Sequence, residues 1–70
     1  MKIIVFVLYK NSEVYTKYAS VDAALAFLQR TGYLTDRSVI VTKNEKAKYF
    51  EKINDLNDLR KEAMEFVTNG

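Results

Sequence analysis

The longest unbroken stretch of hydrophobic residues lies near the start of the chain, at residues 3–9. Side chains alternate between the two faces of a β-strand. Both faces of a strand here would be apolar, one with Ile3, Val5, Val7 and Tyr9 and the other with Ile4, Phe6 and Leu8. This pattern is typical of a strand that is covered on both sides.

A second strand is predicted at residues 13–19, because it is rich in β-branched and aromatic residues. Asn11 and Ser12 separate it from a first strand at residues 2–10. A two-residue turn would place Leu8 opposite Tyr15 and Phe6 opposite Lys17. A longer loop would shift this register by one residue and exchange the faces.

The next segment has the pattern of an amphipathic helix. Ser20 is suited to the N-cap, and Asp22 would place a carboxylate near the positive end of the helix. Hydrophobic residues recur at helical spacing from Val21 to Leu28. Gly32 is the expected end, because glycine readily adopts the backbone conformation that follows a helix.

The second half of the chain repeats this order. Residues 38–43 form an apolar strand, residues 44–46 a turn and residues 48–53 a fourth strand. A second helix begins near Asn54 or Asp55. Its predicted inner side is apolar, with Leu56, Leu59, Ala63, Phe66 and Val67.

The sequence therefore predicts a single small α+β domain over residues 1–70, with the order β-β-α-β-β-α. A right-handed crossover through the first helix allows the sheet order 2-1-3-4, in which all neighbouring strands are antiparallel. This order places the most apolar strands in the centre. Lys17, Lys48 and Lys52 then fall on edge strands, where lysine discourages unwanted pairing. We expect a two-layer sandwich with both helices on one face of the sheet.

Such a fold leaves the other sheet face bare. The expected surface is a hydrophobic patch with a lysine beside it, large enough to indicate contact with a partner. We expect partner contacts from Ile4, Phe6, Leu8, Tyr15 and Lys17, continued on the fourth strand by Lys48 and Phe50. The competing interpretation is that the chain covers this strand itself, for example with bent lysine side chains.

Composition argues against catalysis. The chain has no His, Cys or Trp, which removes the commonest general base, the most nucleophilic side chain and the usual zinc, copper and haem ligands. Asp55 and Asp58 are the best carboxylate pair for a hard cation, but acids in the first turn of a helix are more often caps. We therefore expect that the chain is not an enzyme and that it binds neither a metal ion nor a cofactor.

Net charge and hydropathy limit the possible functions and locations only weakly. The formal net charge is +2, too small to attract nucleic acid or anionic lipid strongly. No hydrophobic stretch is long enough for a membrane span, and the first one lacks a clean signal-peptide cleavage site. These features predict a soluble, cytoplasmic chain.

Nucleic-acid binding is the alternative function. A sheet can offer aromatic side chains for base stacking beside lysines for phosphates. The candidate residues are Tyr15, Lys17, Lys43, Lys46, Lys48 and Tyr49. Nearby glutamates and the scarcity of arginine weigh against this function. The favoured expectation is a non-catalytic protein-binding module, an inhibitor or an adaptor, whose bare face contacts another protein or forms a homodimer.

Overall fold

The computed structural model of the chain describes residues 2–9, 13–32 and 37–69. Its elements follow the predicted order, β-β-α-β-β-α. They are β1 (Ile3–Tyr9), β2 (Tyr15–Tyr18), α1 (Val21–Thr31), β3 (Arg37–Lys43), β4 (Lys46–Phe50) and α2 (Leu56–Asn69). The predicted turn residues Asn11 and Ser12 lie outside the described residues.

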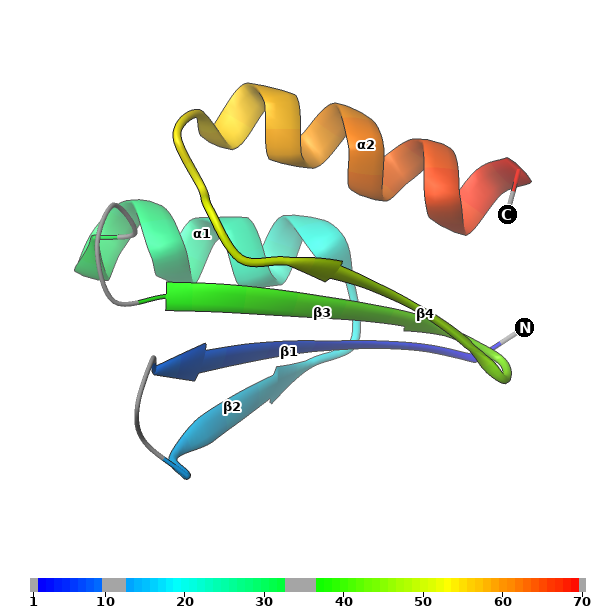
Figure 1. The fold of residues 1–70 in the computed structure, drawn as a ribbon, viewed down its shortest axis with the longest axis horizontal. Helices are drawn as coiled ribbons and strands as arrows, with labels where there is room; N and C mark the ends of the chain where they lie inside the picture. Colours follow the sequence, from blue (N-terminus) through cyan, green and yellow to red (C-terminus); the bar gives the residue numbers. More distant parts are fainter. Residues whose placement is uncertain (1, 10–12, 33–36, 70) are drawn as a thin grey trace.

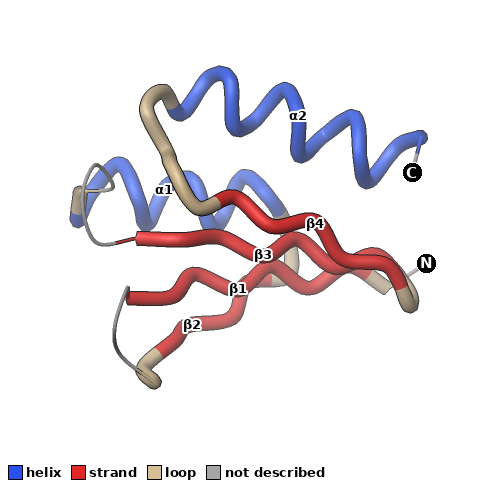
Figure 2. The backbone as a smooth tube through the Cα atoms, viewed as in Figure 1, coloured by secondary structure: helices blue, strands red, loops and turns tan. Residues whose placement is uncertain are grey.

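The four strands form one antiparallel sheet in the order β2-β1-β3-β4, as predicted. Both helices lie on the same side of this sheet, and the opposite side carries no element of the described chain (Figures 1 and 2). The fold is therefore a two-layer α+β sandwich with one covered and one open sheet face. The apolar strands β1 and β3 occupy the centre.

The register of the first hairpin confirms the prediction. Phe6 pairs with Lys17 and Leu8 with Tyr15. At the end of the ladder next to the connection between the strands, the Tyr9 backbone N–H donates to the Val14 carbonyl over 3.3 Å. Cross-strand partners share one face of a sheet, so Lys17 and Tyr15 lie on the same face as Phe6 and Leu8.

The second hairpin differs from the prediction in where its last strand begins. The turn contains only Asn44 and Glu45, so Lys46 already belongs to β4, and β4 ends at Phe50 instead of residue 53. Asn44 makes this tight turn without glycine, because it adopts a positive φ of 56° that asparagine tolerates well. Its side-chain oxygen also accepts from the Lys2 backbone N–H at 3.2 Å, which ties the turn to the start of β1.

Both helices begin at a side-chain cap. The Ser20 hydroxyl accepts from the Ala23 backbone N–H at 3.2 Å in α1, and an Asp55 carboxylate oxygen accepts from the Asn57 N–H at 2.7 Å in α2. Gly32 follows α1 with a φ of 95°, and its N–H donates to the Leu28 carbonyl over 2.8 Å. These contacts confirm the predicted boundaries of the first helix and the start of the second.

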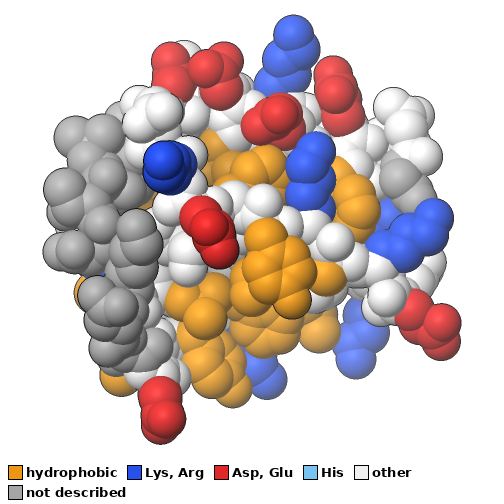
Figure 3. All heavy atoms as spheres, viewed as in Figure 1, with side chains coloured by type: hydrophobic (Ala, Val, Ile, Leu, Met, Phe, Trp, Pro, Cys, Tyr) orange, Lys and Arg blue, Asp and Glu red, His pale blue; other side chains and the backbone are white. Residues whose placement is uncertain are grey.

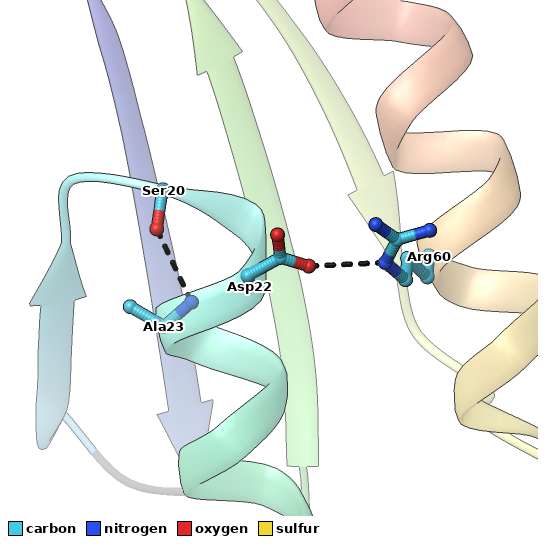
Figure 4. Close-up of polar contacts among 4 residues, drawn as sticks. All are labelled: Ser20, Asp22, Ala23 and Arg60. Carbon is cyan, nitrogen blue, oxygen red and sulfur yellow. Dashed lines mark hydrogen bonds and ion pairs between the residues drawn. The ribbon is translucent and has the colours of Figure 1, made fainter.

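An ion pair joins the two helices on the surface. Arg60 Nε lies 3.0 Å from Asp22 Oδ1, which connects α2 to the first turn of α1 (Figure 4). Both side chains are more than half exposed, so water weakens their attraction. This exposed pair therefore contributes little to the stability of the fold.

The core lies between the helices and the covered face of the sheet. The sheet contributes Val5, Val7, Val39 and Val41, and the helices and the segment before α2 contribute Val21, Ala24, Leu28, Ile53, Leu59, Ala63 and Val67. The alternate residues of β1 and β3 do not belong to this core. Among the described residues, the buried hydrophobic side chains thus lie on one side of the sheet.

Leu28 provides the sharpest test of this core, because its side chain has no solvent exposure. We expect Leu28→Ala to lower the free energy of unfolding by about 2–4 kcal/mol, since it leaves a cavity among valines that cannot collapse fully. Chemical denaturation followed by circular dichroism measures this loss. The exposed Gln29→Ala substitution in the same helix is the control and should change stability by less than about 0.5 kcal/mol. Equal effects of the two substitutions would contradict this placement of the core.

Candidate interaction surface

The open face is the sheet surface opposite the helices. Val5, Val7, Val39 and Val41 point into the core, so the alternate positions of each strand and their cross-strand partners lie on the other side. The open face consists of Ile4, Phe6, Leu8, Tyr15, Lys17, Ser38, Ile40, Thr42, Ala47 and Tyr49. Lys17 is its single charged residue.

A row of four paired residues crosses the middle of the open face. Lys17 on β2 pairs with Phe6 on β1, Phe6 with Ile40 on β3, and Ile40 with Tyr49 on β4. The row therefore has a cation at one end, an aromatic ring at the other and two large hydrophobic side chains between them. This central row is the structural centre of the candidate site.

The side chains of the open face shield one another only in part. The rings of Phe6 and Tyr15 meet edge to face with centroids 5.7 Å apart. Lys17 Nζ lies 6.0 Å from the Phe6 ring centroid, at the outer limit of a cation–π contact. Tyr15 remains 50% exposed and Tyr49 67% exposed. Lys17 therefore leaves part of the open face exposed to solvent.

The two sides of the molecule differ in composition. Figure 3 shows hydrophobic side chains gathered on the lower, sheet side and most of the visible acidic side chains above, over α2. Within the four strands every charged residue is basic, namely Lys17, Arg37, Lys43, Lys46 and Lys48. Apart from Lys17, these residues lie outside the open face.

The expected extension of the site along β4 is corrected by the register. Phe50 pairs with Val39 and Lys48 with Val41, both of which point toward the helices. Phe50 packs against the core, and Lys48 Nζ lies 5.6 Å from its ring centroid. Lys48 and Phe50 therefore do not share a surface with Phe6. Their neighbours Ala47 and Tyr49 continue the open face instead.

The structure adds Ile40 and Thr42 of β3 to the surface, which sequence reasoning missed. Ile40 lies beside Phe6, and the Thr42 hydroxyl donates to the Ile4 carbonyl at 2.7 Å. The information was present in the predicted sheet order. If β1 and β3 are neighbours and Val39 and Val41 are buried, Ile40 must lie on the bare face.

The residues of the nucleic-acid alternative are divided between the two sheet faces. Tyr15, Lys17 and Tyr49 lie on the open face. Lys43, Lys46 and Lys48 occupy positions on the helix side of β3 and β4. RNA bases stacked on Tyr15 and Tyr49 would therefore share the open face with one lysine of this set, Lys17.

The helix-side carboxylates have a structural role. Asp55 caps α2, and Asp58 lies in the first turn, where a negative charge favours the helix. Among residues 2–9, 13–32 and 37–69, no three His, Cys, Asp or Glu side chains gather closely enough to hold a metal ion. In the same ranges, no helix combines the length and the hydrophobicity that a membrane crossing needs.

Comparison with known proteins gives no further assignment, since no family model, curated protein or solved structure matches this chain.

Two adjacent residues of β3 test which sheet face is open. Ile40 is partly exposed, whereas Val41 has no exposure. We expect Val41→Glu to abolish cooperative thermal unfolding, because an unpaired buried carboxylate costs more than the roughly 3–5 kcal/mol that so small a core supplies. Ile40→Glu should keep the fold and lower stability by only about 1 kcal/mol.

Thermal denaturation followed by circular dichroism distinguishes the two variants. Each variant adds one carboxylate to the same strand, β3. A difference in their stability therefore reflects the sheet face on which the carboxylate lies. The placement of the open face is wrong if Ile40→Glu unfolds the chain as completely as Val41→Glu does.

Proposed function

We propose that this chain is a non-catalytic protein-binding module whose contact surface is the open face. The observation that carries the proposal is the central row, in which the partly exposed side chains of Phe6 and Ile40 form a hydrophobic centre between the exposed Lys17 and Tyr49. An exposed hydrophobic patch with polar residues at its border is typical of a surface that another protein covers. Inhibitor and adaptor action would both use such a surface.

Energetics supports the same function. Covering a large hydrophobic side chain stabilises a complex by about 1.5–3 kcal/mol when it passes from full exposure to burial, and less when its own chain already covers part of it, as is the case for Phe6. Aromatic residues are frequent among the residues that dominate binding energy, and the open face carries Phe6, Tyr15 and Tyr49. An uncovered strand of this composition is otherwise prone to aggregate.

Phe6→Glu tests the proposal, because it places a charge in the centre of the open face. The matched control is Gln29→Glu, which adds the same charge at an exposed position of α1 on the helix side. The unmodified chain and both variants serve as bait for proteins of the source cell, with and without nuclease. Circular dichroism first establishes that each bait is folded.

We expect a protein to be retained after nuclease treatment by the unmodified chain and by Gln29→Glu, and to be lost with Phe6→Glu. Equal retention by Phe6→Glu would contradict the use of the open face. Recovery that disappears with nuclease, or that falls steeply as salt rises, would instead favour nucleic-acid binding.

A further inference from the structure

We infer that the protein that covers the open face is a second copy of this chain, packed face to face about a two-fold axis parallel to the strands and between β1 and β3. This inference rests on the proposed function and names the occupant of the same surface. It is carried by the order of residues in the central row and by the sizes of the side chains on either side of it.

The central row is complementary to itself, because its one cation can lie over the exposed aromatic ring at its other end. A two-fold axis parallel to the strands reverses the strand order of the second copy, so that β2 lies over β4 and β1 over β3. Lys17 of one copy then lies over Tyr49 of the other, and Phe6 over Ile40, because these residues occupy the same row. Each end of the row gains a cation–π contact, and hydrophobic side chains meet in the middle.

Side-chain size is complementary in the same arrangement. The open face of β1 carries the large residues Ile4 and Leu8, whose partners on β3 are the smaller Thr42 and Ser38. With β1 over β3, each large side chain of one copy faces a small one of the other. This pairing allows two sheets to approach to the usual separation of about 10 Å.

The other face-to-face arrangement is unfavourable. A two-fold axis perpendicular to the strands would place each strand over its own copy. Lys17 would then lie beside Lys17 of the second copy, and like charges in an interface oppose association. The residue pattern therefore selects one axis direction.

The available area is small. Four strands about 4.8 Å apart give a surface roughly 19 Å wide, and the open face extends over about five residues of each central strand. At about 3.3 Å per residue this surface measures roughly 300 Å² on each copy, or about 600 Å² for the pair, which is below the roughly 1,200 Å² of a standard specific interface. We therefore expect a monomer–dimer equilibrium that depends on protein concentration.

Sedimentation equilibrium over a range of concentrations is the first test. The apparent mass should rise from 8.1 kDa toward twice that value as the concentration increases. Phe6→Glu should raise the dissociation constant at least about 100-fold, because it buries a charge at the centre of the contact. The control Gln29→Glu should leave the constant within about threefold of that of the unmodified chain.

A charge exchange tests the axis direction. Tyr49→Lys should weaken the dimer about tenfold, because it places a lysine over Lys17 of the other copy. The double variant Lys17→Glu, Tyr49→Lys should return the dissociation constant to within about threefold of the original value. Within one chain these positions are three strand spacings, about 14 Å, apart, so an internal contact cannot explain the recovery.

The outcomes separate this inference from the proposed function. One outcome is that the chain stays monomeric at every concentration while Phe6→Glu abolishes capture of a different protein. This result would contradict the dimer and would still support the proposed function. A dimer that the double variant does not restore overturns the proposed axis and with it this inference. A chain that stays monomeric and captures nothing after nuclease overturns both.

Discussion

Two helices can cover only one face of a four-stranded sheet, and the rest of the structure depends on this constraint. The strand β1 is apolar on both faces, and its Val5 and Val7 are sealed beneath the helices. Phe6 on the same strand has no such cover. Since β1 is central in the sheet, its second apolar face lies in the middle of the open face and not at an edge.

The same constraint explains the distribution of charge. Each helix needs its outer side in water, and acids such as Asp22 and Asp55 serve at helix starts. The charged residues within the four strands are all basic, and of these Lys17 alone lies on the open face. A surface with a hydrophobic centre and one peripheral cation favours a partner that offers a hydrophobic centre and an aromatic or acidic border. The open face itself offers such a border at Tyr49, and this is the basis for proposing a second copy as the partner.

The sequence predicts the fold well because its local features agree with one another. Ser20 and Gly32 limit α1, and the alternation from Val5 to Leu8 fixes the register of the first hairpin against Tyr15 and Lys17. The site is predicted less completely. Ile4, Phe6, Leu8, Tyr15 and Lys17 share the open face as expected, because a lysine on an edge strand indicates which side faces solvent.

The error on β4 has a simple cause. Lys46 to Phe50 alternates without a clear polar face, since an aromatic residue occurs on both sides. The register therefore depends on whether the turn contains two or three residues. Asn44 takes a positive φ that usually indicates glycine, and this makes the shorter turn possible. One residue of difference exchanges Lys48 and Phe50 for Ala47 and Tyr49.

The central claim is that protein covers the open face in solution, and methyl NMR with a soluble paramagnetic probe tests it most directly. Ile4, Leu8 and Ile40 report the open face, and Val7 and Val41 report the sealed one. We expect the open-face methyl signals to shift and to lose their contact with the probe as protein concentration rises, while the valine signals stay constant. Open-face signals that keep full contact with the probe at every concentration, and also when the chain is added to the proteins of its source cell, would contradict the claim.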